Sequence, residues 1–330
     1  MSKLSLGLHI FVLYAVFLAH QSQEHRIHPT SQADSSSPTV ITTMKKRASN
    51  LHAMDSKVRS LDTTWSPMQT LYGTTSPSES GDGMPALFAA HNTELSENGF
   101  YGVVATMDVY GYTLNGGQMS TAAIWISNDD GDWKQNLDAI TVGWTVFPSH
   151  FKDSHTHFFT HWTRDADRNT GCLNTDCPGF QLVSRSATAP GDVITHLSDA
   201  NGQRQNITIK LFKDKSSGDW LLHYGFNSAP ALVGHFPASL FESLSKKATQ
   251  IGFGGHVRYM KTVTSPPMGS GSFPSDKAAS FWDLQLIDED GNITRVNNDL
   301  PSTVTDKTSY SVSSIEGAKF SYGGPGGHSS

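Results

Sequence analysis

The chain has 330 residues, 37% of them hydrophobic, which suits one large β domain with appendages or two small domains. Its formal net charge of -6 comes without long acidic or basic runs. This distribution argues against nucleic acid or an anionic membrane surface as a partner.

The N-terminus, residues 1–22, is typical of a signal peptide. Lys3 supplies a positive start, and the mostly apolar run from Leu4 to Ala19 is short for a bilayer span of about 20 residues. We therefore expect a secreted, extracellular protein with no membrane attachment after removal of the signal.

Residues 23–96 are rich in Ser, Thr, Pro, His and Asn, and their apolar residues are sparse and aperiodic. Such a composition buries too little surface to offset chain entropy, so we interpret this segment as a disordered, low-complexity linker or propeptide. Lys45-Lys46-Arg47 within it is a candidate processing site. The folded domain is expected over residues 97–330.

Short segments with a two-residue alternation of side chains follow one another after residue 100, separated by turn signals. The strand candidates are residues 101–109, 122–127, 137–147, 155–163, 180–185, 206–213, 220–226, 250–259 and 279–287. One helix is predicted between Pro237 and Ala248, with a packing stripe of Leu240, Phe241, Leu244 and Ala248. The pattern favours an antiparallel sandwich or barrel.

The strand at residues 137–147 is the most informative. One of its faces is apolar, and the other carries small residues, namely Ala139, Thr141, Gly143 and Thr145. A strand with small side chains on its open face can form the floor of a groove, although an ordinary half-buried strand has the same pattern.

The two cysteines, Cys172 and Cys177, are five residues apart. In a secreted protein they are expected to form a disulfide that holds a turn, because two cysteines alone do not complete a zinc site. The sequons Asn206-Ile-Thr208 and Asn292-Ile-Thr294 predict surface glycosylation at both asparagines.

Three histidines, His155, His157 and His161, are separated by even intervals and would share one strand face. Along a strand, His157 and His161 are about 13 Å apart, too far for one ion. We expect neither a metal site nor a cofactor.

Four motifs, taken with their order, resemble those of the neprosin family of secreted plant peptidases. They are Ile124-Trp-Ile-Ser127, Gly171-Cys…Cys-Pro-Gly-Phe180, Met268-Gly-Ser-Gly-Ser-Phe-Pro274 and Tyr322-Gly-Gly-Pro-Gly326. The resemblance implies an all-β fold, an antiparallel β-sandwich of two large sheets whose groove takes an extended peptide. It also implies a glutamic-type prolyl endopeptidase that uses two carboxyls, one ionised and one protonated.

At the positions of the family's two glutamates, this chain departs from the motif. The first strand has Thr141 where the family has glutamate, and the second has Gly252 and His256 at the two acidic positions of its motif. Ala123 stands where the family commonly has glutamine. A threonine hydroxyl cannot activate water as a carboxylate does, whereas an imidazole can transfer protons near neutral pH.

We therefore interpret the chain as a catalytically impaired neprosin-domain protein that binds an extended, proline-rich peptide or cell-wall protein. The expected binding groove contains Ala123, Trp125, Gly143, Gly252, Gly254 and Arg258, and the aromatic rings of Trp125, Trp144 and Trp162 would suit proline.

Two alternatives remain open. One is an active endopeptidase of altered mechanism, which would use a Thr141–His256 pair or other carboxylates such as Asp138 or Asp165. The other is an extracellular structural protein without a ligand, whose groove is filled by its own side chains or N-terminal segment.

Overall fold

The computed structural model describes residues 78–79, 85–128, 136–165, 167 and 169–329. Within them the chain is nearly all β, which confirms the predicted fold class. The short helices are α3 (Pro148–Phe151) and the 3-10 turn η1 (Ala238–Leu240). The strands are β1 (Ser78–Glu79), β2 (Pro85–Asn92), β3 (Gly102–Asp108), β4 (Gln118–Asn128), β5 (Asp138–Val146), β6 (His157–Thr163), β7 (Cys172–Leu173), β8 (Gln181–Leu182), β9 (Asn206–Lys213), β10 (Trp220–Phe226), β11 (Ala231–Phe236), β12 (Gln250–Tyr259), β13 (Met268–Gly269), β14 (Ala279–Ile287), β15 (Ile293–Arg295), β16 (Ser302–Val304), β17 (Ser311–Val312) and β18 (Lys319–Gly324).

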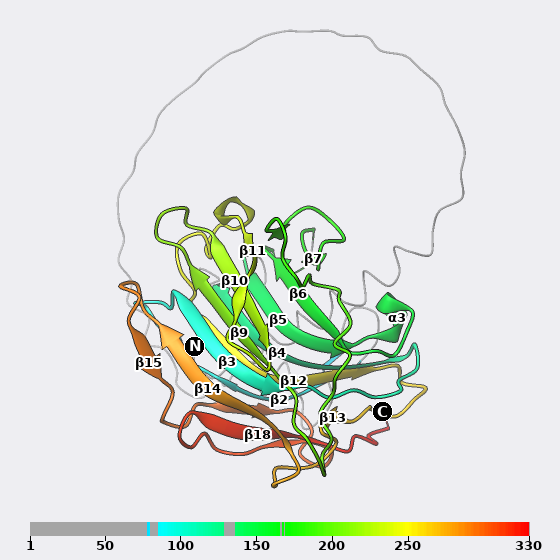
Figure 1. Cartoon of the computed structure of the whole chain (residues 1–330). Coiled ribbons are helices and arrows are strands. Elements are labelled where there is room, and N and C mark those ends of the chain that lie inside the picture. The colour runs from blue at the N-terminus through cyan, green and yellow to red at the C-terminus, as the bar shows by residue number, and fades with distance from the viewer. Residues whose placement is uncertain (1–77, 80–84, 129–135, 166, 168, 330) are drawn as a thin grey trace, which may run out of the picture.

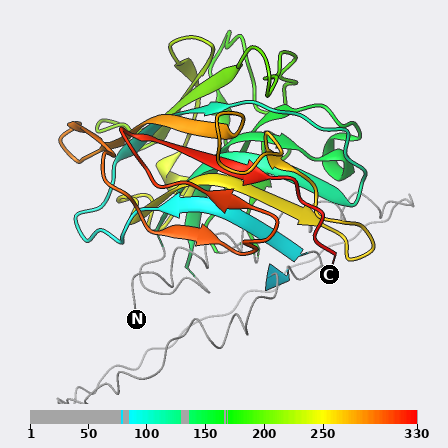
Figure 2. The same ribbon diagram turned by 90° about the horizontal axis from the view of Figure 1, so that it is seen from below.

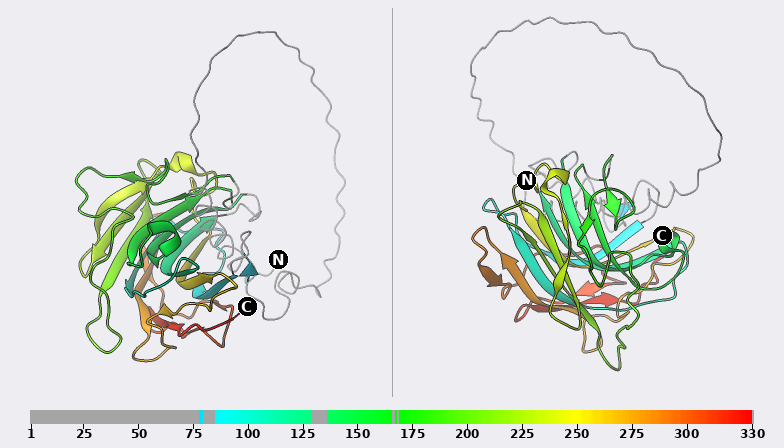
Figure 3. Two further views of the ribbon diagram at one scale, coloured as in Figure 1. Left: turned by 90° about the vertical axis from the view of Figure 1, so that its right-hand side faces the viewer. Right: turned by 45° about the horizontal axis from the view of Figure 1, so that its top comes forward.

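Two antiparallel sheets form the sandwich (Figure 1). The 8-stranded sheet has the order β1-β2-β12-β4-β5-β6-β7, with β16 also paired to β2. The 10-stranded sheet has the order β13-β18-β14-β3-β9-β10-β11-β8, with β15 beside β14 and β17 beside β18. Figure 2 shows β2 in cyan between β12 and β16, and Figure 3 shows the stacked sheets from two further sides.

The main core lies between the two sheets and is built by the alternation of each strand. In β5, the side chains of Ile140, Val142, Trp144 and Val146 all enter it. The indole N–H of Trp144 donates to the Asp108 carbonyl oxygen at 2.8 Å, which links β5 to β3 of the other sheet. Trp162 also lies in this core. Trp144 and Trp162 are therefore unavailable to a ligand on the opposite face, contrary to the expectation that they would contact proline.

Strand β2 lies before residue 97, where the sequence placed the start of the folded domain. Its residues, Pro-Ala-Leu-Phe-Ala-Ala-His-Asn, are buried throughout and pair with β12. The domain boundary predicted at residue 97 is therefore too late. Because both faces of β2 are covered, the strand has no alternation of polar and apolar residues that would reveal it.

The segment from Pro237 to Ala248 contains only the turn η1, so the predicted helix is wrong in extent. Its apolar residues nevertheless pack as expected: Phe241, Leu244 and Ala248 are buried in the main core. The Asp138 carboxylate accepts bonds from the backbone N–H groups of residues 242–244, which supports a compact turn instead of a helix.

The signal peptide, the Lys45-Lys46-Arg47 site and most of the predicted linker lie outside the described residues. Among the residues that are described, no helix is long and apolar enough to cross a membrane.

Candidate functional site

The predicted groove residues lie on one face of the 8-stranded sheet, the one turned away from the core between the sheets. We call it the distal face and define it by the outward residues of four strands: Gly252, Gly254, His256 and Arg258 of β12, Thr121, Ala123 and Trp125 of β4, Thr141, Gly143 and Thr145 of β5, and His157, Phe159 and His161 of β6. Every candidate groove and dyad residue from the sequence is in this set.

Strand register arranges these residues in rows across the sheet. Gly252 pairs with Trp125, Trp125 with Thr141, and Thr141 with His161. The next row contains only small residues on three strands, Gly254, Ala123 and Gly143. A third row places His256 opposite Thr121. Small side chains in the middle row leave the backbone of β4 and β5 without bulky cover on this side.

His256 is not a neighbour of Thr141, because β4 lies between β12 and β5. The two residues are also four positions apart along the strand direction, about 13 Å, in addition to two strand spacings of about 10 Å. A direct Thr141–His256 nucleophile pair therefore does not form. The Thr141 hydroxyl has no hydrogen-bond partner among the described residues.

The imidazole of His256 is enclosed by aromatic rings. It stacks on Phe88 with ring centroids 5.5 Å apart and lies 6.0 Å from the Trp125 ring. Burial lowers the pKa of His256 to about 3, and the nearby Arg258 guanidinium adds to the decrease. His256 is therefore neutral at physiological pH and does not supply an imidazolium acid.

The distal face is not open to solvent in the whole chain. Thr141 is 1% exposed, His256 0% and Arg258 1%. The large apolar residues of this face, Trp125 and Phe159, form a buried cluster with Phe88 of β2 that is separate from the main core. A ligand reaches this face only if what covers it is displaced or removed.

The two carboxylates considered from the sequence have structural roles. Asp138 faces the core side and accepts bonds from Ser243 Oγ and three backbone N–H groups, and burial raises its pKa. Asp165 accepts bonds from the backbone and side chains of Asn169 and Thr170, which hold the loop after β6. These bonds outweigh the effect of burial and lower the pKa of Asp165.

A third carboxylate, Asp167, was not identified from the sequence. Its side chain is 0% exposed, and its Oδ1 lies 3.3 Å from Nε2 of His161, which pairs across the strands with Thr141. Burial raises the pKa of Asp167 to about 6, although His161 partly counteracts this. The only signal in the sequence was the position of Asp167 in a polar loop directly after a strand with histidines.

The three spaced histidines do not gather around one point. His155 is 67% exposed and lies before β6, whereas His157 bonds to Asp153 at 3.0 Å and to the Gly191 carbonyl at 2.8 Å. Among the described residues, no three His, Cys, Asp or Glu side chains are placed to hold a metal ion.

The disulfide between Cys172 and Cys177 is present, with Cα atoms 5.9 Å apart. It holds the turn beside β7, where Cys172 pairs with Trp162 of β6. Of the two sequon asparagines, Asn292 is exposed and Asn206 is half-buried on the 10-stranded sheet.

Comparison with known proteins gives one family match and several solved structures. The family model described as Neprosin matches residues 116–325. A crystal structure of scytalido-glutamic peptidase with a transition state analog inhibitor is 11% identical, with a TM-score of 0.40, covering 72% of this chain and 98% of that chain. SCP-B, a member of the Eqolisin family of peptidases in complex with the tripeptide Ala-Ile-His, is 10% identical, with a TM-score of 0.35 and the same coverage.

Proposed function

Because this chain belongs to the neprosin family, we propose that it is a secreted, peptidase-derived protein that binds an extended, proline-containing peptide on the distal face without hydrolysing it. The observation that carries this proposal is the row Gly252–Trp125–Thr141–His161, in which no side chain is a carboxyl. Glutamic-peptidase chemistry needs two carboxyls facing one water.

The distal face has features that suit an extended peptide. The row Gly254–Ala123–Gly143 allows a backbone to approach, and Trp125 beside it offers an aromatic surface to a proline ring. Arg258 adds a guanidinium on the same strand as His256. Since this face is buried in the whole chain, the form that binds is expected to be a processed one.

The test uses protein secreted from an expressing cell, with its N-terminus determined by mass spectrometry. We expect an octapeptide with a central proline to bind in calorimetry and to remain intact between pH 3 and pH 8. Ala123→Trp should lower the affinity at least tenfold by filling the small row, whereas Ala231→Trp, at an exposed position on β11, should not. Thermal unfolding checks that both variants fold. Peptide cleavage, or equal affinities for both variants, would refute the proposal.

One observation favours a second candidate function, a hydrolase of altered mechanism. Asp167 is buried beside His161, and His161 is directly opposite Thr141, so an acid, an imidazole and a hydroxyl lie next to one another on the distal face. In such an arrangement the carboxylate orients the imidazole, and the imidazole takes the hydroxyl proton.

A second Asp–His pair provides the matched control, since Asp153, before β6, lies 3.0 Å from His157 on the same strand as His161. If the second function is correct, peptide cleavage by the processed protein is lost in Asp167→Asn and His161→Gln and kept in Asp153→Asn. The absence of cleavage in the unmodified protein, or its survival in both of the first two variants, excludes this function.

A further inference from the structure

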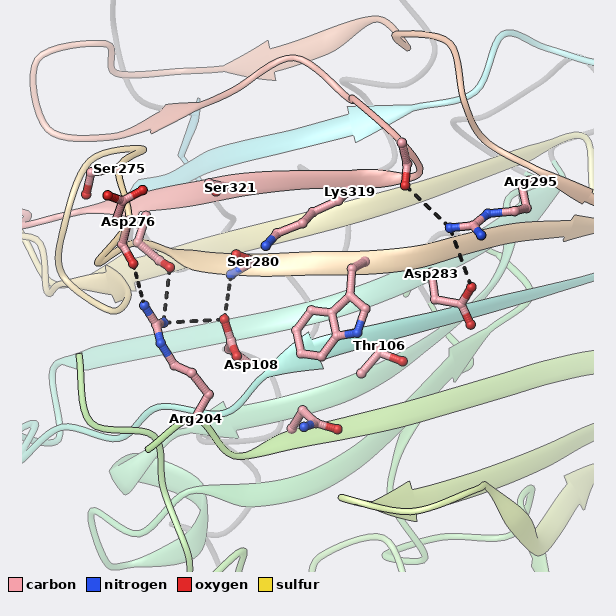
Figure 4. A pocket seen from close by; sticks show the side chains of 14 residues that line it. Thr106, Asp108, Arg204, Ser275, Asp276, Ser280, Asp283, Arg295, Lys319 and Ser321 are labelled. Carbon is pink, nitrogen blue, oxygen red and sulfur yellow. Dashed lines mark hydrogen bonds and ion pairs between the residues drawn. The ribbon is translucent and has the colours of Figure 1, made fainter. Parts of the chain in front are cut away.

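A hollow of about 840 Å³ lies on the outer face of the 10-stranded sheet, on the opposite side of the sandwich from the distal face. We call it the outer hollow. Its floor is formed by the outward residues of β3, β9, β14 and β18, and its walls by Arg204, Ser275, Asp276, Ala278, Arg295 and Gly317. Figure 4 shows these side chains converging on the hollow.

At the centre of the floor is Trp282, which is half-buried, whereas Trp125, Trp144, Trp162 and Trp220 are buried. Trp282 pairs with Lys319 of β18 on one side and with Thr106 of β3 on the other. The neighbouring positions carry hydroxyl, carboxyl and amide groups: Ser280 and Ser321 pair with each other, as do Asp108 and Asn206. One indole ring is thus surrounded by hydrogen-bonding groups.

An ion pair lies at each end of the hollow. At one end Arg204 lies 3.4 Å from Asp108 and donates to the carbonyl oxygens of Asp276 and Ala278. At the other end Arg295 contacts Asp283 at 4.0 Å. Because the hydrogen bonds of Arg204 set its position before any ligand arrives, this end of the hollow is preorganised, whereas Arg295 and Asp283 are both exposed.

The charges in the outer hollow balance. Three carboxyls, from Asp108, Asp276 and Asp283, face three cationic groups, from Arg204, Arg295 and Lys319. Lys319 interacts electrostatically with the Asp108 carboxyl, and its ammonium and the Asp276 side chain both line the hollow, where they can bond to a ligand. A polyanion such as a nucleotide would meet three carboxyls here, whereas an uncharged ligand rich in hydroxyls would find donors and acceptors on all sides.

We propose that the outer hollow is a saccharide-binding site that stacks the C–H face of an uncharged sugar ring on Trp282. Hydroxyls of the sugar bond to Lys319, Asp276 and Thr106. Sugars have the two surfaces that this hollow matches, a flat apolar face for an aromatic ring and a hydroxylated rim. The proposal is independent of the function of the distal face.

Two sources of such a sugar fit the site. Asn206, the asparagine of the first sequon, lines the hollow, so the inner sugars of a glycan attached to it would lie beside Trp282. A separate oligosaccharide has the same chemistry. The experiment separates the two sources through Asn206→Gln, with Asn292→Gln at the exposed second sequon as the matched control.

The first arm uses the full chain from a glycosylating host, with site occupancy measured by mass spectrometry. If the attached glycan occupies the hollow, Asn206→Gln lowers Tm by roughly 2–4 °C and Asn292→Gln does not. In a Trp282→Leu background the substitution Asn206→Gln then no longer changes Tm. In a Trp282→Phe background, which keeps an aromatic ring, the decrease in Tm is preserved.

The second arm uses the Asn206→Gln protein on an array of neutral oligosaccharides, followed by calorimetry with the best binder. Here Trp282→Leu should lower affinity roughly tenfold and Trp282→Phe much less. Phe273→Ala, at an exposed aromatic residue outside the hollow, should leave affinity unchanged. A decrease in Tm that depends on Trp282 identifies the glycan attached to Asn206 as the source. Oligosaccharide binding that depends on Trp282 identifies a separate oligosaccharide. If Trp282→Leu folds and changes neither measurement, the proposal is wrong.

Discussion

Single residues decide whether the distal face can transfer protons. Thr141 provides a hydroxyl without a partner among the described residues, and His256 is buried between aromatic rings with a pKa near 3. The buried acid Asp167 has a pKa near 6 and contacts His161 instead of either dyad position.

The low pKa of His256 predicts a specific loss of stability in acid. Below pH 6.5 the unfolded chain binds a proton at this residue, while the folded chain stays unprotonated until about pH 3. The contribution of His256 to the free energy of unfolding is therefore fully present above pH 6.5 and decreases as the pH falls toward 3. Between pH 7 and pH 4 the decrease amounts to about 3 kcal/mol.

Urea denaturation at the two pH values measures this effect. His256→Gln has no imidazole to titrate. Between pH 7 and pH 4 its free energy of unfolding should therefore fall by about 3 kcal/mol less than that of the natural chain. His196→Gln, at an exposed histidine, should follow the natural chain. Parallel pH profiles for His256→Gln and the natural chain would contradict the prediction.

If two glutamates are introduced on the distal face, the peptidase activity they produce should depend on whether they lie in the same row. Gly252 and Thr141 are in the same row with Trp125 between them, so their Cα atoms are about 10 Å apart and two glutamates can converge. In the processed protein, whose distal face is accessible, we expect Thr141→Glu with Gly252→Glu to cleave a fluorogenic peptide at pH 3–6 at least tenfold faster than Thr141→Glu with His256→Glu. The reverse ranking would show that the row assignment does not govern the chemistry.

At the scale of elements, β5 depends on close contact with β4. A Cβ added at Gly143 would lie 2.0 Å from the Ala122 carbonyl oxygen and 2.7 Å from the Ala123 Cα. Backbone atoms cannot move aside as flexible side chains do, so a side chain here would separate two central strands. The small middle row of the distal face is thus a packing requirement as well as a surface feature.

Gly143→Ala should therefore lower the free energy of unfolding by more than about 2 kcal/mol. Gly116→Ala is the control, because the nearest atom to its added Cβ is Ser149 Oγ at 3.8 Å. Chemical denaturation of both variants gives the comparison. Similar stabilities would mean that β4 and β5 adjust without cost.

At the scale of the whole molecule, one core joins the two sheets. The Trp144 indole bonds to the Asp108 carbonyl of the opposite sheet, and the Trp220 indole bonds to the Leu244 carbonyl at 2.9 Å. These two bonds fix large buried side chains whose N–H groups would otherwise be unsatisfied. The sheets should consequently unfold as one cooperative unit.

Trp144→Phe removes the hydrogen bond between the sheets and leaves a cavity, so we expect it to lower the free energy of unfolding by about 2–3 kcal/mol. Trp282→Phe, on the outer face, should lower the free energy of unfolding by less than about 1 kcal/mol. Fluorescence and far-UV circular dichroism should give coincident unfolding curves for both variants. Separate transitions by the two probes would show that the sheets unfold independently.

Strands with one buried and one polar or small face were predictable from alternation, and β9, β10, β12 and β14 begin and end at the predicted residues. Strand β2 was missed because both of its faces are covered, and the helix predicted after Pro237 was wrong because its apolar spacing serves a turn anchored by Asp138. Asp167 was missed because a loop aspartate has no periodic pattern.

The sequence by itself determined the all-β class, the family motifs and the absence of glutamate at residues 141, 252 and 256, because alternation and residue identity are local properties. Only the tertiary structure decided that Gly252, not His256, shares a row with Thr141, that His256 is buried and neutral, and that Trp282 is the centre of the outer hollow. These properties depend on the pairing and register of strands far apart in the chain, which short-range patterns do not encode.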